Sequence, residues 1–197
     1  MSISTYSELQ TAVASWAHRS DLTSLIPDFI ALCEADLAIR CKLVDFEGTA
    51  SISVTAGTGA LPADYAGFRA AKWDANPDRP LTYLTPDALN TVAENGGPPG
   101  FYTVTGTSVK VAPGGDGLLI LTYQAKLTAL SNTNTTNTIL TRYPDAYLQG
   151  TLLQAGVWAR DTEAIGLHSG LYETAVARIK TDNQQRKYPG PLQVRPR

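Results

Sequence analysis

The sequence predicts an α+β protein, in which N- and C-terminal helices form one helical bundle that carries an inserted antiparallel β-rich segment. Two observations predict this fold class. Apolar residues recur at helical spacing near both ends of the chain, whereas the middle alternates apolar and polar residues between Gly- and Pro-containing turns. The expected parts are the first half of the bundle (1–41), the β-rich segment (42–139), the second half of the bundle (140–187) and an extended C-terminal arm (188–197).

The length and composition suit a chain that folds on its own. It has 197 residues, of which 43% are hydrophobic and 17% are charged. A chain of this size can bury enough apolar surface to fold without disulfides or a structural metal. The apolar fraction excludes disorder throughout the chain, and the low charged fraction predicts an unusually uncharged surface.

Two helices are expected in the N-terminal part, over residues 5–18 and 23–41. Thr5 and Glu8 have the spacing of a capping box, in which each side chain accepts a backbone N–H of the first turn. Pro27 suits the first turn of the second helix, because its missing N–H costs little there. The apolar residues that define the two buried faces are Leu9, Val13, Trp16, Phe29, Cys33 and Leu37.

Short strands joined by turns are expected in the middle of the chain. Ile52 and Val54 alternate with polar residues, and Gly106 lies in the turn of a predicted hairpin. The other predicted elements are strands at 68–73, 81–84, 102–104, 108–111 and 118–124, a turn at 76–80, and a short helix at 86–93. The polar run 131–138 predicts an exposed loop.

Helical spacing of apolar residues returns after Pro144, which is expected to open a helix. Gly150 and Gly156 would each weaken this helix by about 1 kcal/mol relative to alanine. Close approach of another backbone is therefore their expected use. A last helix follows and reaches about residue 185.

No metal or cofactor is expected. Cys33 and Cys41 are eight helical steps apart, about 12 Å, which is too far for a disulfide, so both are expected to be reduced and buried. His18 and His168 are far apart in the sequence. A zinc site would need more ligands at closer spacing.

The chain is not expected to be an enzyme. It has no G-x-S-x-G elbow, Walker A loop or H-E-x-x-H helix. The nearest carboxylate pairs, Glu34 with Asp36 and Asp161 with Glu163, are two positions apart and point in different directions on a helix. These acids are expected to lie on solvated faces.

The charge balance requires neither a nucleic acid nor an anionic membrane as a partner, because the net charge is only −2. The longest apolar runs, such as Leu118–Leu121, are far too short to span a bilayer. The residues after Met1 lack the basic and apolar regions of a signal peptide, so export is not expected.

The expected C-terminal arm combines positive charge with apolar side chains. The basic residues near the end of the chain are Arg186, Lys187, Arg195 and Arg197. They contribute +4, which leaves −6 for the rest of the chain. Three prolines prevent the helix from continuing, and an extended arm would reach about 30 Å. Most chain ends touch nothing, but Tyr188, Leu192 and Val194 favour the alternative, an arm that docks through apolar anchors.

Strings of residues in two regions carry a resemblance to a known family. They are Thr5–Gln10, Trp16, Leu25–Leu32 and Glu34–Ala35 near the N-terminus, and Thr136–Leu140, Tyr143–Leu148 and Gly150–Ala155 near the C-terminus. In the second region an Asn-containing loop enters a helix through a Pro-Asp pair. On these residues the chain resembles the head-to-tail adaptor proteins of tailed bacteriophages. Pro80–Tyr83 and Pro99–Tyr102 match the strand-rich middle of that family more loosely.

The resemblance implies a structural protein of the virion, located at the head–tail junction and assembled in the host cytoplasm. Such proteins form a homo-oligomeric ring, commonly twelve-fold, that binds the portal protein and offers a platform to the next tail or nozzle protein. Genomic DNA would pass through the ring without sequence-specific binding, and no membrane is involved. The expected portal-docking residues are Tyr188, Leu192, Val194, Arg195 and Arg197, and the expected subunit contacts are Trp73, Tyr147 and Trp158.

Two alternatives stay open. One is a carbohydrate- or surface-binding β module of a phage tail, which would use exposed aromatic residues of the β-rich segment. The other is a small hydrolase with a site that the fold assembles around His168 and Asp161, and this alternative requires a pocket that unites the two residues.

Overall fold

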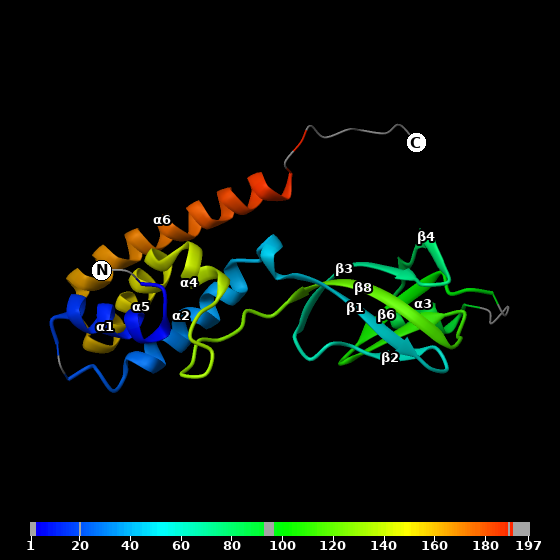
Figure 1. The fold of residues 1–197 in the computed structure, drawn as a ribbon, viewed down its shortest axis with the longest axis horizontal. Helices are drawn as coiled ribbons and strands as arrows, with labels where there is room; N and C mark the ends of the chain where they lie inside the picture. Colours follow the sequence, from blue (N-terminus) through cyan, green and yellow to red (C-terminus); the bar gives the residue numbers. More distant parts are fainter. Residues whose placement is uncertain (1–2, 20, 93–96, 189, 191–197) are drawn as a thin grey trace. The chain divides into compact units, whose positions relative to one another are not determined.

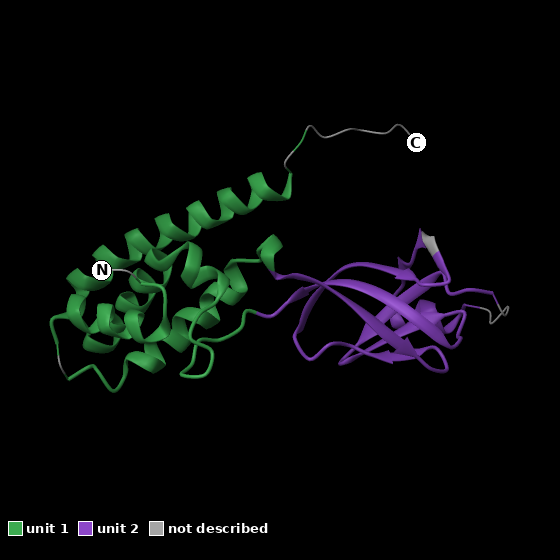
Figure 2. Cartoon of the chain, in the orientation of Figure 1, with its two compact units in different colours: residues 1–45, 127–197 green, residues 46–126 purple. Residues whose placement is uncertain are grey.

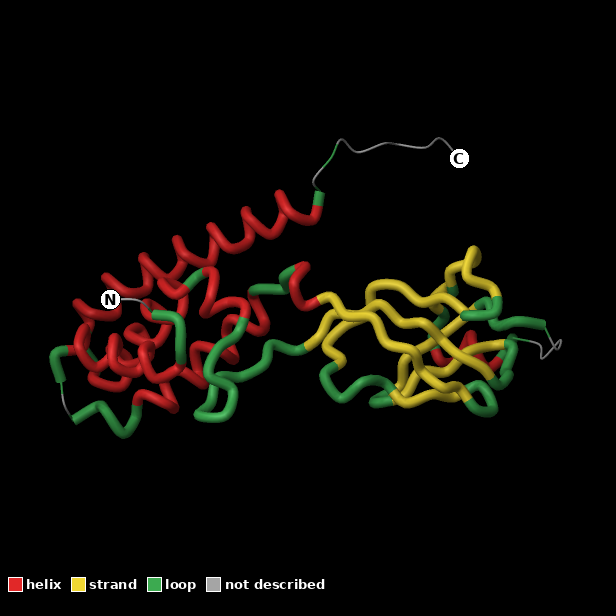
Figure 3. Tube along the Cα trace, in the orientation of Figure 1, coloured by secondary structure: helices red, strands yellow, loops and turns green. Residues whose placement is uncertain are grey.

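The chain divides into two compact units, which Figure 2 shows in different colours. The computed structural model describes residues 3–19, 21–92, 97–188 and 190. One unit contains residues 1–45 and 127–197, and the other contains residues 46–126. Helices gather in the first unit and strands in the second (Figure 3), so the expected α+β organisation is confirmed.

The β unit is shorter than the expected segment 42–139. Residues 127–137, which follow the last strand, lie with the helical unit. The backbone N–H of Tyr6 donates to the carbonyl of Thr135 at 2.7 Å, and the side chain of Asn137 donates to the carbonyl of Thr128 at 3.0 Å. These hydrogen bonds join the returning loop to the first helix and hold the loop to itself.

The two N-terminal helices are α1 (Tyr6–Ala17) and α2 (Ile26–Arg40), shown in Figure 1. The predicted capping box is confirmed: Glu8 N–H donates to Thr5 Oγ1 at 3.3 Å, and Thr5 N–H donates to Glu8 Oε2 at 3.1 Å. Helix α2 begins three residues later than predicted, with Pro27 in its first turn. The residue before it, Leu25, has no side chain that could cap the helix.

The C-terminal helices are α4 (Thr138–Arg142), α5 (Pro144–Ala159) and α6 (Thr162–Lys187). The short helix α4 was not predicted. Asn137 caps it, accepting the Leu140 N–H on Oδ1 at 2.9 Å. Asp161 caps α6 in the same way, with its carboxylate accepting the N–H groups of the first turn.

Helix α5 packs against α1, α2 and α6. A Cβ atom at Gly150 would lie 2.4 Å from Cys33 Sγ on α2 and 2.8 Å from Tyr172 Cε2 on α6. The prediction of a close neighbour at Gly150 is therefore right, but the neighbours are side chains and not a backbone. At Gly156 the backbone nitrogen of Ile165 would be 3.4 Å from such an atom, as expected of a close backbone approach.

Glu34 is buried and not solvated as the sequence suggested, with only 7% of its surface exposed. Its Oε1 accepts the Leu130 N–H at 2.8 Å and the Tyr147 hydroxyl at 2.9 Å. Burial raises the pKa of this carboxyl above its ordinary value. The side chain of Asn137 donates to the Tyr147 oxygen at 2.7 Å, so Glu34 anchors the returning loop to α2 and α5.

The β unit consists of two four-stranded sheets. In spatial order they are β1 (Glu47–Val54), β8 (Gly117–Ala125), β3 (Tyr65–Trp73) and β4 (Asn76–Pro80), and β2 (Thr58–Ala60), β7 (Ser108–Ala112), β6 (Phe101–Thr105) and β5 (Thr82–Tyr83). Both sheets contribute to one apolar core, which includes Val54, Trp73, Tyr102, Val111 and Leu121. The short helix α3 (Pro86–Asn90) follows β5, and a 3-10 turn at Val44–Phe46 precedes β1.

Two details of the β unit differ from the prediction. Residues 76–80 form the strand β4 instead of a turn, pairing antiparallel with β3. This strand is at the edge of its sheet, where a proline such as Pro80 is tolerated. The short pair β5–β6 is parallel, whereas every other pair of named strands in the described part is antiparallel. The predicted hairpin around Gly106 is confirmed.

Candidate functional site

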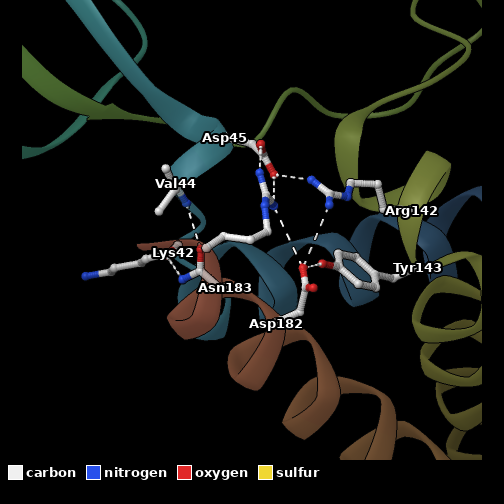
Figure 4. A network of polar contacts seen from close by, with 8 residues as sticks. Lys42, Val44, Asp45, Arg142, Tyr143, Asp182 and Asn183 are labelled. Atoms are coloured by element: carbon white, nitrogen blue, oxygen red, sulfur yellow. Dashed lines mark hydrogen bonds and ion pairs between the residues drawn. The ribbon is translucent and has the colours of Figure 1, made fainter. Parts of the chain in front are cut away.

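The base of the predicted docking arm is the C-terminal end of α6, where an ionic network surrounds Asp45 (Figure 4). Arg186 Nη1 donates to Asp45 Oδ2 at 2.7 Å, and its other terminal nitrogen binds the second carboxylate oxygen. Arg142 Nη1 donates to Asp45 Oδ2 at 3.1 Å. One carboxylate thus binds two guanidinium groups, from α6 and from the end of α4.

A second carboxylate, Asp182, completes the network. It accepts the Tyr143 hydroxyl at 2.5 Å and lies 3.9 Å from both Arg142 and Arg186. Burial and this hydrogen bond raise the pKa of Tyr143. The two arginines and the two aspartates of the network balance in charge.

Asn183 clamps the segment that follows α2 (Figure 4). Its Oδ1 accepts the Val44 N–H at 2.8 Å, and its Nδ2 donates to the Lys42 carbonyl at 3.0 Å. A single amide therefore satisfies two backbone groups of residues 42–44. Together with Asp45, this contact fixes the last two turns of α6 to the rest of the helical unit.

Replacing Asp45 with asparagine is expected to lower the free energy of unfolding of the helical unit by about 1 kcal/mol at pH 7, because the charged acceptor of both arginines is lost. The hydrogen bond from Arg186 holds the pKa of Asp45 below its ordinary value. Its contribution is therefore present above the unfolded pKa of about 3.9 and is lost as the pH falls through the lower, folded pKa.

Helical circular dichroism during thermal unfolding at pH 7, 4 and 3 measures this loss. The difference between wild type and Asp45→Asn should shrink as the pH falls. The matched control is Asp74→Asn, an exposed aspartate of the β unit. A difference that is independent of pH, or equal for the two variants, would contradict the role of Asp45.

Only Tyr188 of the five predicted docking residues lies in the described part of the chain. Its backbone N–H donates to the Gln184 carbonyl at 3.2 Å, and Lys187 Nζ lies 5.6 Å from the centre of its ring. The residue is 56% exposed. Leu192, Val194, Arg195 and Arg197 lie outside the described residues. Arg186, counted among the arm charges, is instead bound by Asp45.

Two of the three predicted subunit contacts are buried in the single chain. Trp73 lies in the core of the β unit, and Tyr147 is fully buried between Glu34 and Asn137. Trp73 is 6% exposed and Tyr147 is 0% exposed, so neither offers more than a trace of surface to another subunit. Trp158 is 52% exposed, with Phe29 on one side and the Arg19 guanidinium 5.9 Å from its ring centre. It stays a candidate contact.

The structure brings Asp161 and His168 to one cavity of about 210 Å³ in the helical unit, as the hydrolase alternative requires. Both groups have other partners: the Asp161 carboxylate accepts two N–H groups at the start of α6, and His168 Nδ1 lies 2.8 Å from Gln149 Oε1. Burial lowers the pKa of His168, which favours its neutral form. None of the described residues that line the cavity is a serine, threonine or cysteine.

The alternative of a carbohydrate-binding β module needs exposed aromatic rings. In the described part of the β unit, Tyr83 is the only aromatic residue whose ring is largely exposed, and its edge contacts Tyr102. Tyr102 is itself buried against Phe68, with ring centres 4.3 Å apart. The rings therefore stabilise the core of the unit more than they offer a platform for a sugar.

Cys33 and Cys41 are free thiols and are buried, as expected, and burial raises the pKa of both. Among the described residues, no group of three or more His, Cys, Asp or Glu side chains is placed to hold a metal ion. No helix in the described part is both long and apolar enough to cross a membrane.

The family model described as SU10 adaptor protein matches residues 4–195, which is nearly the whole chain. No curated protein matches the chain.

Proposed function

Because the chain belongs to the SU10 adaptor protein family, which is a family of structural phage adaptors, we propose that it forms a ring below the portal. The match over residues 4–195 is the observation that carries this proposal. The ring, of twelve copies, extends the DNA channel from the head and provides the platform to which the next tail or nozzle protein attaches. It assembles in the host cytoplasm and stays at the head–tail junction of the virion, without a catalytic role.

Portal docking is assigned to the C-terminal arm, with Tyr188, Leu192 and Val194 as apolar anchors and Arg195 and Arg197 as partners of acidic groups on the portal. The rigid base of the arm supports this role. Asn183 and Arg186 hold the last turns of α6, and Tyr188 follows them with its ring exposed. An arm that starts from a fixed point loses less conformational freedom on docking than one that starts from a frayed helix.

Removing all residues after Lys187 is expected to weaken portal binding by at least 100-fold, because the anchors and two of the basic groups are lost together. The fold should not change, since Asp182, Asn183 and Arg186 stay in place. Binding to a purified portal ring, followed by electron microscopy and sedimentation, measures the first effect. Thermal unfolding measures the second.

Two matched variants separate the contributions within the arm. The double variant Leu192→Ser, Val194→Ser removes apolar anchors. The double variant Arg195→Gln, Arg197→Gln removes charge, and the loss of portal affinity that it causes should be smaller at high salt. Portal binding that survives the truncation would remove the arm from the mechanism while leaving the family assignment untouched.

Passage of DNA is consistent with the charge of the chain. The net charge is −2, and it is −6 without the four basic residues at the C-terminal end. Affinity for nucleic acid comes mainly from basic side chains that neutralise phosphates. A body with this negative charge has little affinity for the phosphate backbone of the passing DNA. No sequence-specific contact with the DNA is proposed.

A further inference from the structure

The cavity of about 210 Å³ in the helical unit lies between the end of α1, the end of α5 and the start of α6, and is called the Trp16 cavity below. Small residues form much of its wall, namely Ala17, Ala155, Gly156, Ala159 and Ala164. Pockets for drug-sized ligands measure about 300–1,000 Å³. The Trp16 cavity is smaller and is therefore suited to a single long side chain.

Asp161 brings to this cavity a carboxylate oxygen that the helix cap does not use. Its Oδ1 accepts the N–H groups of Glu163 and Ala164, both at 3.1 Å, whereas Oδ2 makes no hydrogen bond with the described residues. The guanidinium in the lining, that of Arg19, is already bound to Asp21 by hydrogen bonds of 3.0 and 2.6 Å. Two carboxylates thus face one guanidinium, which leaves one negative charge beside the cavity.

His168 and Trp16 add a second acceptor and an aromatic face to the lining. His168 Nδ1 lies 2.8 Å from Gln149 Oε1, an oxygen that only accepts, so Nδ1 carries the proton and Nε2 of the neutral ring is an acceptor. Burial lowers the pKa of His168, in agreement with the neutral form. Trp16 is 54% exposed, and indole is the side chain whose face attracts cations best.

These groups together match an arginine side chain. Its apolar stem can lie along Leu22 and Leu152, which also line the cavity. Its planar guanidinium can stack on Trp16 and donate to carboxylate and imidazole at the same time, which the compact ammonium of lysine does less well. An acidic side chain would be repelled by Asp161.

Arginines of this kind lie near the end of the sequence. Arg195 and Arg197 flank Pro196, and no acidic residue follows Asp182. The arginines and this proline lie outside the described residues. Extended segments that contain proline dock on aromatic side chains, because they lose little conformational freedom on binding. The C-terminal arm therefore has the charge and the composition that the Trp16 cavity selects.

The arm of the same copy is too short to reach this cavity. Asp161 caps the start of α6, and the arm begins after Lys187 at the other end of the helix (Figure 1). These two residues are 26 positions apart, about 39 Å along the helix axis. At about 3.1 Å per residue, Arg195 lies within about 25 Å of Lys187 and Arg197 within about 31 Å. The turn needed to run back along α6 shortens both distances, so the arm must come from a second copy.

We propose that the Trp16 cavity holds an arginine of the C-terminal arm of a second copy, Arg195 or Arg197, while no portal is bound. The guanidinium stacks on Trp16 and donates to the free oxygen of Asp161. Each copy offers one arm and one cavity, so the contact is heterologous and can repeat from copy to copy. The inference rests on the proposed function in one respect: the portal competes for the same arginines and releases them from the cavity.

A synthetic peptide of residues 188–197 tests the site. The receptor is the full chain with Arg195→Gln and Arg197→Gln, whose own arm does not compete, and the anisotropy of labelled peptide measures binding. Adding Asp161→Asn to the receptor is expected to weaken binding about 10-fold or more. The helix should persist, because asparagine caps as well as aspartate. Ala159→Leu, which fills the cavity from a half-buried position, should weaken binding to a similar extent.

The matched control for charge is Glu163→Gln, at an exposed acid that is two positions from Asp161 and is not part of the lining. It should change the affinity less than about 2-fold. A peptide with glutamine at both arginine positions should bind about 10-fold more weakly or less. Equal affinity of the receptor with and without Asp161→Asn and Ala159→Leu would overturn the proposal. Absence of binding at about 1 mM peptide would also overturn it.

The outcome is separable from that of the portal proposal. Peptide binding in the cavity, together with portal binding that survives removal of the arm, would refute only the portal role. Loss of portal binding on removal of the arm, without any binding of the peptide to the cavity, would refute only the contact between copies.

Discussion

Replacing Gly150 with alanine is expected to lower the free energy of unfolding of the helical unit by about 2 kcal/mol. The new methyl carbon would lie 2.4 Å from Cys33 Sγ and 2.8 Å from the ring of Tyr172. Both neighbours are buried, so neither can move away freely. Overpacking of this kind costs about 1–3 kcal/mol and outweighs the gain of about 1 kcal/mol in helix propensity. Loss of helical circular dichroism in urea measures the effect.

Gly170→Ala is the matched control, since it makes the same change in a helix but in open space. At protein concentrations that keep the chain monomeric, it should raise the free energy of unfolding by up to about 1 kcal/mol. Combining Gly150→Ala with Cys33→Ala should recover part of the loss, because the sulfur atom is the nearest neighbour. Equal effects of the two glycine substitutions would mean that α2 and α6 do not pack on Gly150 as described.

Glu34→Ala is expected to lower the free energy of unfolding by about 3 kcal/mol. It leaves the Leu130 N–H and the Tyr147 hydroxyl without their common acceptor in a buried position. A buried donor left unpaired costs about 1–3 kcal/mol, and truncation of the side chain also leaves space between α2 and α5. The returning loop should become accessible to proteolysis near Leu130, which mass spectrometry of short digests measures.

Glu34→Gln separates the hydrogen bonds from the charge. The amide oxygen can still accept from both donors, so the loss at pH 7 should be well below that of Glu34→Ala. Burial raises the pKa of Glu34 in the folded state. Its favourable contribution is therefore fully present below the unfolded pKa of about 4.3 and is lost as the pH rises through the folded pKa.

Wild type should consequently lose stability relative to Glu34→Gln between pH 4 and 7. If the stability difference instead grew in favour of wild type over that range, the carboxylate would be stabilised by a charge that the described contacts do not contain.

The features that the sequence predicts correctly depend on neighbours within a few positions. The capping box joins Thr5 and Glu8, and the hairpin turns at Gly106. Glu34 was misjudged because its partners, Leu130 and Tyr147, are 96 and 113 positions away. No local pattern distinguishes such a carboxylate from a solvated one.

The same limit applies to the base of the arm. In the sequence Arg186 is one charge of a basic tail, whereas its partner Asp45 is 141 positions away. Asn183 likewise binds Val44, which is 139 positions away. For Asn137 a signal was available, because an asparagine just before Ile139 and Leu140 is typical of a helix cap. Exposure of Trp158 and burial of Tyr147 on the same helix depend on which helices surround α5, and the spacing of apolar residues does not show this.

The insertion of the β unit between α2 and α4 imposes an order of events during synthesis. Strands β1 to β8 pair with one another, so this unit can fold as soon as it leaves the ribosome. Helices α1 and α2 pack on α5, which begins at Pro144, about a hundred residues after α2 ends. At about 5–20 residues per second, both helices wait roughly 5–20 s with their apolar faces uncovered. During this interval we expect the nascent chain to depend on chaperones that bind exposed apolar surface.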